Sequence, residues 1–204
     1  MLLRRLVQLY VGLVLFGLTC GMLILSDLGN MPWDVLGQGF EVQTGLGTGV
    51  WAIVIGAVVL LLWIPLRVRP GLGTISNVII VGLVIQLMLD NFAEADDLPV
   101  QLALVVGGIL VNGLASGLYI GARFGPGPRD GLMTGLAARG HSIRVVRTGI
   151  EAIVLIVGIV LGGTFGIATV LYAVAIGPIV HRSLPWLTAP EAEPAGEARV
   201  GVAA

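Results

Sequence analysis

Charged side chains are scarce in this sequence, at 11% of its 204 residues, whereas an ordinary soluble domain carries roughly a quarter. Lysine is absent, so every basic side chain is an arginine, and the net charge of −1 excludes the concentrated basic field that binds nucleic acid. A single cysteine, Cys20, excludes an intramolecular disulfide and a cysteine-based metal cluster. Hydrophobic residues make up 56% of the chain, and the mean hydropathy is +1.00. These values exclude a water-soluble fold and predict an all-α membrane protein.

Long, nearly charge-free intervals indicate about six transmembrane helices, because a bilayer core about 30 Å thick needs about 20 apolar residues per helix. The first interval is of spanning length, so we interpret it as a helix rather than as a signal peptide. The last long interval exceeds one span and is divided at the glycine-rich stretch 162–166. The expected spans are residues 6–26, 46–66, 72–89, 99–122, 146–163 and 165–182.

The arginines predict the orientation of these spans, because positively charged loops are retained in the cytoplasm. Arginines precede the first span, separate the second from the third, and surround the loop after the fourth. The alternate loops contain acidic residues and no arginine. Both termini are therefore predicted to be cytoplasmic. Residues 188–204, rich in Ala, Pro and Glu, are expected to form a disordered cytoplasmic tail.

The two halves of the chain resemble each other at a separation of about 96 residues. Chance agreement at so many Gly, Pro and Asp positions is improbable, so we interpret residues 1–97 and 98–187 as two repeats of three spans. An odd number of spans forces the second repeat into the opposite orientation, which is the inverted-repeat plan of many secondary transporters. The matching pairs are Gly12/Gly108, Gly17/Gly113, Gly21/Gly117, Gly29/Gly125, Pro32/Pro128, Asp34/Asp130, Leu36/Leu132 and Gly39/Gly135.

Each repeat contains a Pro-x-Asp motif after its first span, followed by a short amphipathic run. Proline is favoured at the first helical position, and an acid nearby complements the helix dipole. The two acids are therefore interpreted either as helix caps or as parts of an outer and an inner gate at a central cavity. The candidate gate and substrate-binding residues are Pro32, Trp33, Asp34, Arg123, Pro128, Arg129 and Asp130.

Three of these residues have a structural interpretation as well as a binding interpretation. Arg123 and Arg129 could receive an anionic substrate at the cytoplasmic mouth, or they could serve only the positive-inside bias, which we favour. Trp33 is most simply an aromatic anchor at the membrane interface.

Polar residues inside the expected spans are functional candidates, because they are costly there. Glu151 lies four residues after Arg147, which is the spacing of a helical ion pair, so a structural and a coupling role are both open. Asn112 is a third candidate, although hydrogen bonding between helices is the commoner use of such residues. The glycines of the first and fourth spans predict that these two helices pack closely against each other.

Enzyme activity is not expected, because no catalytic constellation is present. Ser116 has Leu114 where the nucleophile motif of rhomboid proteases requires glycine, and His141 and His181 are isolated, without metal-ligand spacing. Neither a catalytic residue nor a metal or other cofactor is therefore predicted.

The stretch 117–133, which includes Gly-Pro-Gly-Pro-Arg-Asp, resembles the YczE/YyaS/YitT family of bacterial membrane proteins, in particular its YczE-like branch. The segments 27–34, 69–74 and 147–151 also match, and the resemblance extends from about Arg4 to Leu184. It implies a multi-pass protein of the bacterial plasma membrane, but it implies no particular substrate.

Two hypotheses for the function remain. The first is a secondary transporter or exporter of an unidentified small molecule, in which the two repeats rock to give alternating access; it rests on architecture, which is weak evidence for function. The second is a non-transporting scaffold or regulatory subunit for a partner protein, and a chain this small could need a homodimer to enclose a path. A water-accessible cavity lined by Asp34, Asp130 and Glu151 would favour transport.

Overall fold

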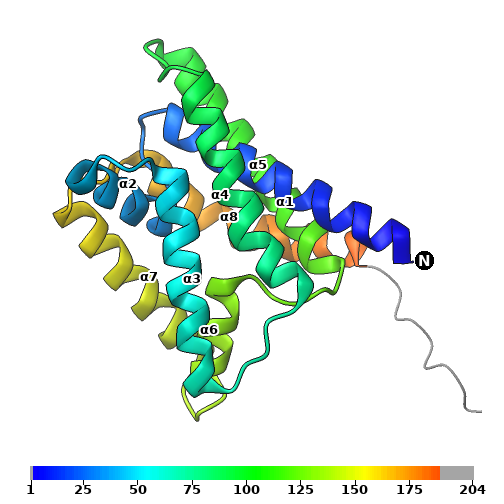
Figure 1. Ribbon diagram of the computed structural model, residues 1–204. Helices are drawn as coiled ribbons and strands as arrows, with labels where there is room; N and C mark the ends of the chain where they lie inside the picture. The colour runs from blue at the N-terminus through cyan, green and yellow to red at the C-terminus, as the bar shows by residue number, and fades with distance from the viewer. Residues whose placement is uncertain (1, 189–204) are drawn as a thin grey trace, which may run out of the picture.

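The computed structural model describes residues 2–188, and this part of the chain is entirely helical. The predicted tail lies outside the described residues except for Thr188. The helices, labelled in Figure 1, are α1 (Leu2–Leu25), α2 (Pro32–Thr44), α3 (Thr48–Leu66), α4 (Leu72–Asn91), α5 (Leu98–Gly121), α6 (Pro128–Ala137), α7 (Ile143–Val160) and α8 (Ile167–Leu187).

Five of these helices, α1, α3, α4, α5 and α8, are long and apolar enough to cross a bilayer. They correspond to five of the six expected spans. The remaining expected span coincides with α7, which has 18 residues, contains the three charged residues Arg144, Arg147 and Glu151, and is not among these five. The predicted break in the last long interval is confirmed, because α7 ends at Val160 and α8 begins at Ile167.

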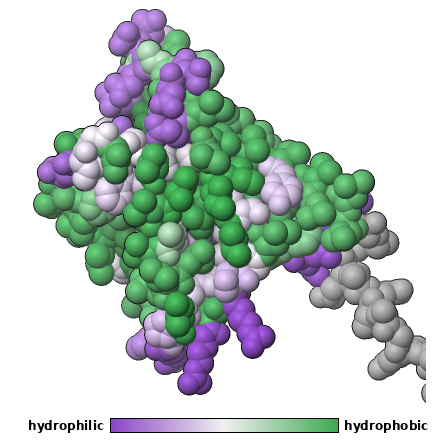
Figure 2. All heavy atoms as spheres, viewed as in Figure 1, coloured by the Kyte–Doolittle hydropathy of each residue, from purple (hydrophilic) through white to green (hydrophobic). Residues whose placement is uncertain are grey.

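The surface shows the hydropathy pattern of a membrane protein. Apolar side chains cover most of the face seen in Figure 2, and hydrophilic residues gather at its two extremes, at the α4–α5 turn and near α6. Many large aliphatic side chains are exposed, among them Leu61, Ile64, Leu87 and Ile156. A soluble monomer rarely exposes such extensive apolar surface, and the pattern is the one expected of a protein surrounded by lipid.

The centre of the fold is the pair α1 and α5, which pack along each other as the glycine pattern predicts. Gly12 allows the closest approach: a Cβ atom there would lie 2.8 Å from the backbone nitrogen of Tyr119. On either side, α4 packs against α1 and α8 packs against α5. The short helices α2 and α6 each contact both α3 and α7.

Residues with positive φ recur at a separation of 95 or 96 positions. Such backbone angles are uncommon for residues other than glycine, so their recurrence means that the two halves share local geometry. All eight examples among the described residues fall into four pairs: Asp27/Arg123, Gly29/Gly125, Gly45/Gly140 and Arg67/Gly162.

The contacts between the halves recur in the same way. The backbone nitrogen of Gly73 donates to the carbonyl oxygen of Phe124 at 2.8 Å, and that of Ala168 donates to the carbonyl oxygen of Leu28 at 2.9 Å. In both places the first turn of a long helix, α4 or α8, is held by the loop that precedes α6 or α2. Each half therefore fixes a helix start in the other half.

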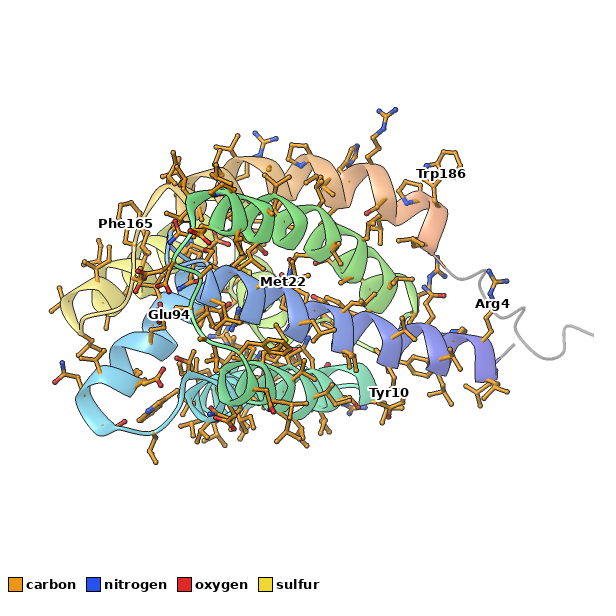
Figure 3. All side chains as sticks on the ribbon, turned by 90° about the horizontal axis from the view of Figure 1, so that it is seen from above. Arg4, Tyr10, Met22, Glu94, Phe165 and Trp186 are labelled. Atoms are coloured by element: carbon orange, nitrogen blue, oxygen red, sulfur yellow. The ribbon has the colours of Figure 1, made fainter. Side chains whose placement is uncertain are left out.

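One pair of helices breaks this correspondence. α3 packs along α4, where a Cβ atom on Gly82 would lie 2.6 Å from the carbonyl oxygen of Gly49. α7 and α8, the helices about 95 residues later, do not pack along each other over the described residues. They diverge from the turn at Phe165 in Figure 3. A Cβ atom on Gly177, which corresponds to Gly82, would meet no atom within 4 Å.

Candidate functional site

The two Pro-x-Asp motifs form the first turns of α2 and α6, with Pro32 and Pro128 at the predicted first helical positions. The capping interpretation of the acids is correct in part: both lie in the first turn of their helix, where they complement the helix dipole, but neither is the N-cap residue. The N-cap residues are Met31 and Gly127, and neither helix has a side-chain cap hydrogen bond. The carboxylates are instead used in contacts with other helices.

Asp34 forms a buried ion pair with Arg129. Arg129 Nη2 donates to Asp34 Oδ1 at 3.3 Å, and the side chain of Asp34 is only 1% exposed. Burial raises the pKa of the Asp34 carboxyl above its ordinary value, and the Arg129 guanidinium opposes this shift. The other oxygen, Asp34 Oδ2, is buried without a hydrogen-bond partner. The acid of one motif thus binds the arginine of the other, and the expected outer and inner gates meet each other directly.

Trp33 lies beneath this ion pair rather than at the membrane interface. Its side chain is buried, with 7% exposed, and the Arg129 guanidinium stacks over its ring at 5.2 Å from the centroid. Arg129 therefore has both a carboxylate and an aromatic partner, which is more than the positive-inside bias requires. The interpretation of Trp33 as an interfacial anchor is wrong, because the start of α2 points into the protein.

Asp130 has a different environment from Asp34. Tyr119, on α5, donates its hydroxyl proton to Asp130 Oδ2 at 3.1 Å. The two ion pairs among the described residues are Asp34 with Arg129 and Arg147 with Glu151, and Asp130 belongs to neither. Trp63 Nε1 donates to the Pro128 carbonyl oxygen at 3.0 Å, which ties the start of α6 to α3.

A cavity of about 380 Å³ lies beside these motifs. Its wall combines apolar residues with an unusual number of polar ones for a protein of this composition. α7 and α8 border one side of it, where they do not pack along each other. The polar and aromatic lining residues are Phe16, Trp33, Asn77, Ser116, Tyr119, Arg129, Asp130, Arg147, Glu151, Tyr172 and His181.

The predicted ion pair on α7 is present at the edge of this cavity. Arg147 Nε donates to Glu151 Oε1 at 3.0 Å, and the two side chains are 55% and 34% exposed. The corresponding positions of α3, 95 residues earlier, are occupied by Ala52 and Gly56. The charged pair therefore lies on α7, which is apart from α8. The small residues Ala52 and Gly56 lie on α3, which is in contact with α4.

Asn112 and Arg123 do not line the cavity. Asn112 is fully buried, donates to Thr19 Oγ1 at 2.7 Å, and accepts the hydroxyl proton of Tyr172 at 3.0 Å. It links α1, α5 and α8, which is the interhelical role common for such residues. Arg123 is exposed in the turn after α5, in the left-handed conformation.

Sequence reasoning missed two aromatic residues of the site. Tyr119 and Trp63 both donate hydrogen bonds to polar groups at the cavity, yet neither has a polar partner in its own apolar span. Tyrosine and tryptophan usually find a partner for their polar atom when buried, and this is the only signal that could have marked them. Over residues 2–188, no group of three His, Cys, Asp or Glu side chains is placed to hold a metal ion.

Comparisons with known proteins support this description of a membrane protein. The profile of a family described as a family of unknown function (DUF6198) matches residues 3–184. An uncharacterised protein of Haemophilus influenzae is 40% identical over 171 residues, which cover 83% of this chain and 78% of the relative.

Two proteins of Bacillus subtilis match as well. The uncharacterised membrane protein YczE is 30% identical over 160 residues, covering 78% of this chain and 74% of its own. The uncharacterised protein YyaS is 29% identical over 182 residues, covering 86% and 90% respectively. No solved structure gives a significant match. The chain therefore belongs to the family of unknown function DUF6198 and is a membrane protein of the YczE and YyaS kind.

Proposed function

We propose that this protein is a secondary transporter or exporter of a small molecule, and that the cavity beside α2 and α6 is its substrate site. The observation that carries the proposal is the lining of that cavity. Asp130, Glu151, Arg129 and Arg147 all border it, although the surrounding protein is overwhelmingly apolar. Ionisable groups within a membrane domain are costly to keep, and they mark substrate and ion pathways.

The architecture that we propose has six spans, with α7 as the fifth in chain order, arranged as two inverted repeats. The paired left-handed residues and the reciprocal contacts between the halves support the repeat. The charges of α7 are compatible with a span because two of them, Arg147 and Glu151, neutralise each other and face the cavity. In this arrangement both termini lie on the cytoplasmic side of the plasma membrane, so the acidic α4–α5 turn lies outside the cell.

Alternating access in this proposal arises because α3 packs along α4, whereas α7 does not pack along α8. In an inverted repeat, exchanging the conformations of the two halves turns the access path to the other side. Arg147 lies near the start of α7 and His181 near the end of α8, and both ends are cytoplasmic in the proposed topology. The described conformation is then open toward the cytoplasm, and closure of α7 on α8 accompanies opening of α3 from α4.

The scaffold hypothesis receives less support from the site. A scaffold needs no internal space, and its spans would be expected to seal through apolar contacts. Here Asp130 and Glu151 line a cavity, although Asp34 is buried behind the lining in its ion pair. This favours transport, with an unidentified small molecule and the lipid bilayer as the partners; a homodimer is not required to form the cavity.

The proposed topology predicts opposite accessibility of the α4–α5 and α6–α7 turns. Single cysteines replacing the exposed residues Asp96 and His141, in a Cys20→Ala background, should be labelled by a membrane-impermeant maleimide from opposite faces of the membrane. Asp96→Cys should react in intact cells, and His141→Cys only in inverted vesicles. Labelling of both from one face would refute the inverted repeat.

The transport proposal predicts ligand-dependent stabilisation of the purified protein. A ligand at about 100 times its dissociation constant should stabilise the folded state by roughly 2.7 kcal/mol. We expect at least one compound, in a panel of metabolites, antibiotics and lipids, to raise the melting temperature saturably in detergent. The same compound should be taken up by proteoliposomes under an imposed gradient. A stabilising compound that is never transported would instead favour the scaffold or regulatory role.

A further inference from the structure

The charges at the centre of the site do not balance. One arginine of the cavity wall, Arg129, forms its ion pair with Asp34 and not with Asp130, the next residue of the chain. The second arginine at the cavity, Arg147, is engaged by Glu151. Asp130 is left in the cavity wall with the phenol of Tyr119 as its described side-chain partner. Asp130 is thus the carboxylate of the cavity wall that forms no ion pair among the described residues, while both guanidinium groups of the wall are bound to other acids. Together with Asp34 behind the wall, three carboxylates accompany two arginines, and His181 also lines the cavity.

The repeat explains why this carboxylate is left over. Asp34 and Asp130 occupy matching positions, and Arg129, the partner of Asp34, matches Trp33 in the other half. A symmetric centre would need an arginine at position 33 to bind Asp130. The indole of Trp33 supplies no charge, and its face is already covered by the Arg129 guanidinium.

The geometry around Asp130 presents its carboxyl group to the cavity. It is the third residue of α6, in the first turn of the helix. The hydrogen bond from Tyr119 OH to Asp130 Oδ2 fixes its orientation. An acidic side chain in a cavity among apolar helices is costly to keep, and it marks a place where a cation could bind.

The rest of the wall suits an apolar body attached to that cation. Phe16, Val78, Val81 and Ile176 provide aromatic and aliphatic surface, and the ring of Tyr172 lines the same cavity. A cation is attracted both by a carboxylate and by the faces of aromatic rings, and this attraction is stronger in a desolvated site. A simple inorganic cation would leave the apolar wall unused.

We propose, building on the transporter function above, that the cavity binds lipophilic organic cations, with the Asp130 carboxylate as the counter-charge and Tyr119 as its positioning residue. The arginines are not the substrate-binding groups in this scheme. Arg129 holds α6 to α2 through Asp34, and Arg147 is neutralised within α7.

Two probes of nearly equal size and opposite charge test the proposal. Tetraphenylphosphonium and tetraphenylborate should be titrated into the full-length protein in detergent, with binding followed by isothermal titration calorimetry. We expect the phosphonium to bind and Asp130→Asn to weaken its binding at least tenfold. Asp130→Glu, which keeps the charge, should retain most of the affinity, and Tyr119→Phe should lose several-fold. Asp96→Asn, at an exposed turn, is the matched control and should bind like the unmodified protein.

The outcomes separate this proposal from the transporter function. Phosphonium binding that is equal in the unmodified protein and in Asp130→Asn, with both folded by thermal melting, would overturn the cation site. Binding of the borate alone would overturn it as well, and would leave a transporter of anions. Phosphonium binding through Asp130 without uptake into proteoliposomes would sustain the site but refute transport.

Discussion

Replacing Arg129 by alanine is expected to destabilise the protein by about 3–5 kcal/mol, because it leaves the buried Asp34 carboxylate without its counter-charge. The melting temperature in detergent should fall by on the order of 10 °C. The stacking of the guanidinium on Trp33 is lost in the same variant, which adds to the effect.

A second ion pair supplies the control for this experiment. Arg147→Ala breaks a pair whose side chains are 55% and 34% exposed, and it should cost at most about 1 kcal/mol. The double variant Asp34→Asn with Arg129→Gln removes both charges of the pair, so it should recover much of the loss. Equal effects of Arg129→Ala and Arg147→Ala would show that the Asp34 pair is not the main contact between α2 and α6.

Gly177→Ala is expected to reduce transport at least tenfold without lowering the stability of the protein. In the described conformation a Cβ atom at this position meets nothing within 4 Å. Closure of α7 on α8 would give Gly177 an environment equivalent to that of Gly82 between α3 and α4. A Cβ atom on Gly82 would lie 2.4 Å from the Ile53 side chain and 2.6 Å from the Gly49 carbonyl oxygen. Alanine should therefore hold the protein in the open conformation.

The readouts for Gly177→Ala are uptake into proteoliposomes, which should be lost, and ligand binding in detergent, which should be retained. Because Gly177 lines the cavity, loss of binding would instead show that the added methyl group occupies the substrate site. Gly149→Ala is the matched control. It is also a helix-interior glycine with open space around its Cβ position, but it corresponds to Val54, which is partly exposed rather than packed against α4. Both variants should gain up to about 1 kcal/mol of helix stability. Unimpaired transport by Gly177→Ala would refute closure of α7 on α8.

Several features of the fold were predicted correctly because their causes are local. The break after α7 follows from five residues that include three glycines, and the starts of α2 and α6 follow from proline at the first helical position. The Arg147–Glu151 pair follows from the four-residue spacing on one helix. The glycines repeated in α1 and α5 were expected to bring helices close together, and they do, although among them only Gly12 and Gly108 face the α1–α5 contact. The other glycines of the two patterns face α4 or α8.

The candidate site was predicted only in part. The motif residues at 32–34 and 128–130 were correctly placed at helix starts, but the sequence could not show that Asp34 would bind Arg129, which is 95 residues away. Trp33 was misplaced at the membrane interface, because tryptophan is common there and its sequence neighbours do not reveal where the start of α2 points. Tyr119 was missed because nothing in its own span identifies Asp130 as its partner.

The sequence by itself therefore determined the membrane class, the helices and the matching of the two halves, since hydropathy, glycine, proline and charge act over one or two helical turns. Tertiary structure alone decided which acid is neutralised and which is left in the cavity. It also decided that α3 contacts α4 while α7 stands apart from α8. These outcomes depend on how the two halves dock, because a contact between residues 95 positions apart exists only once both helix starts are fixed in the same place.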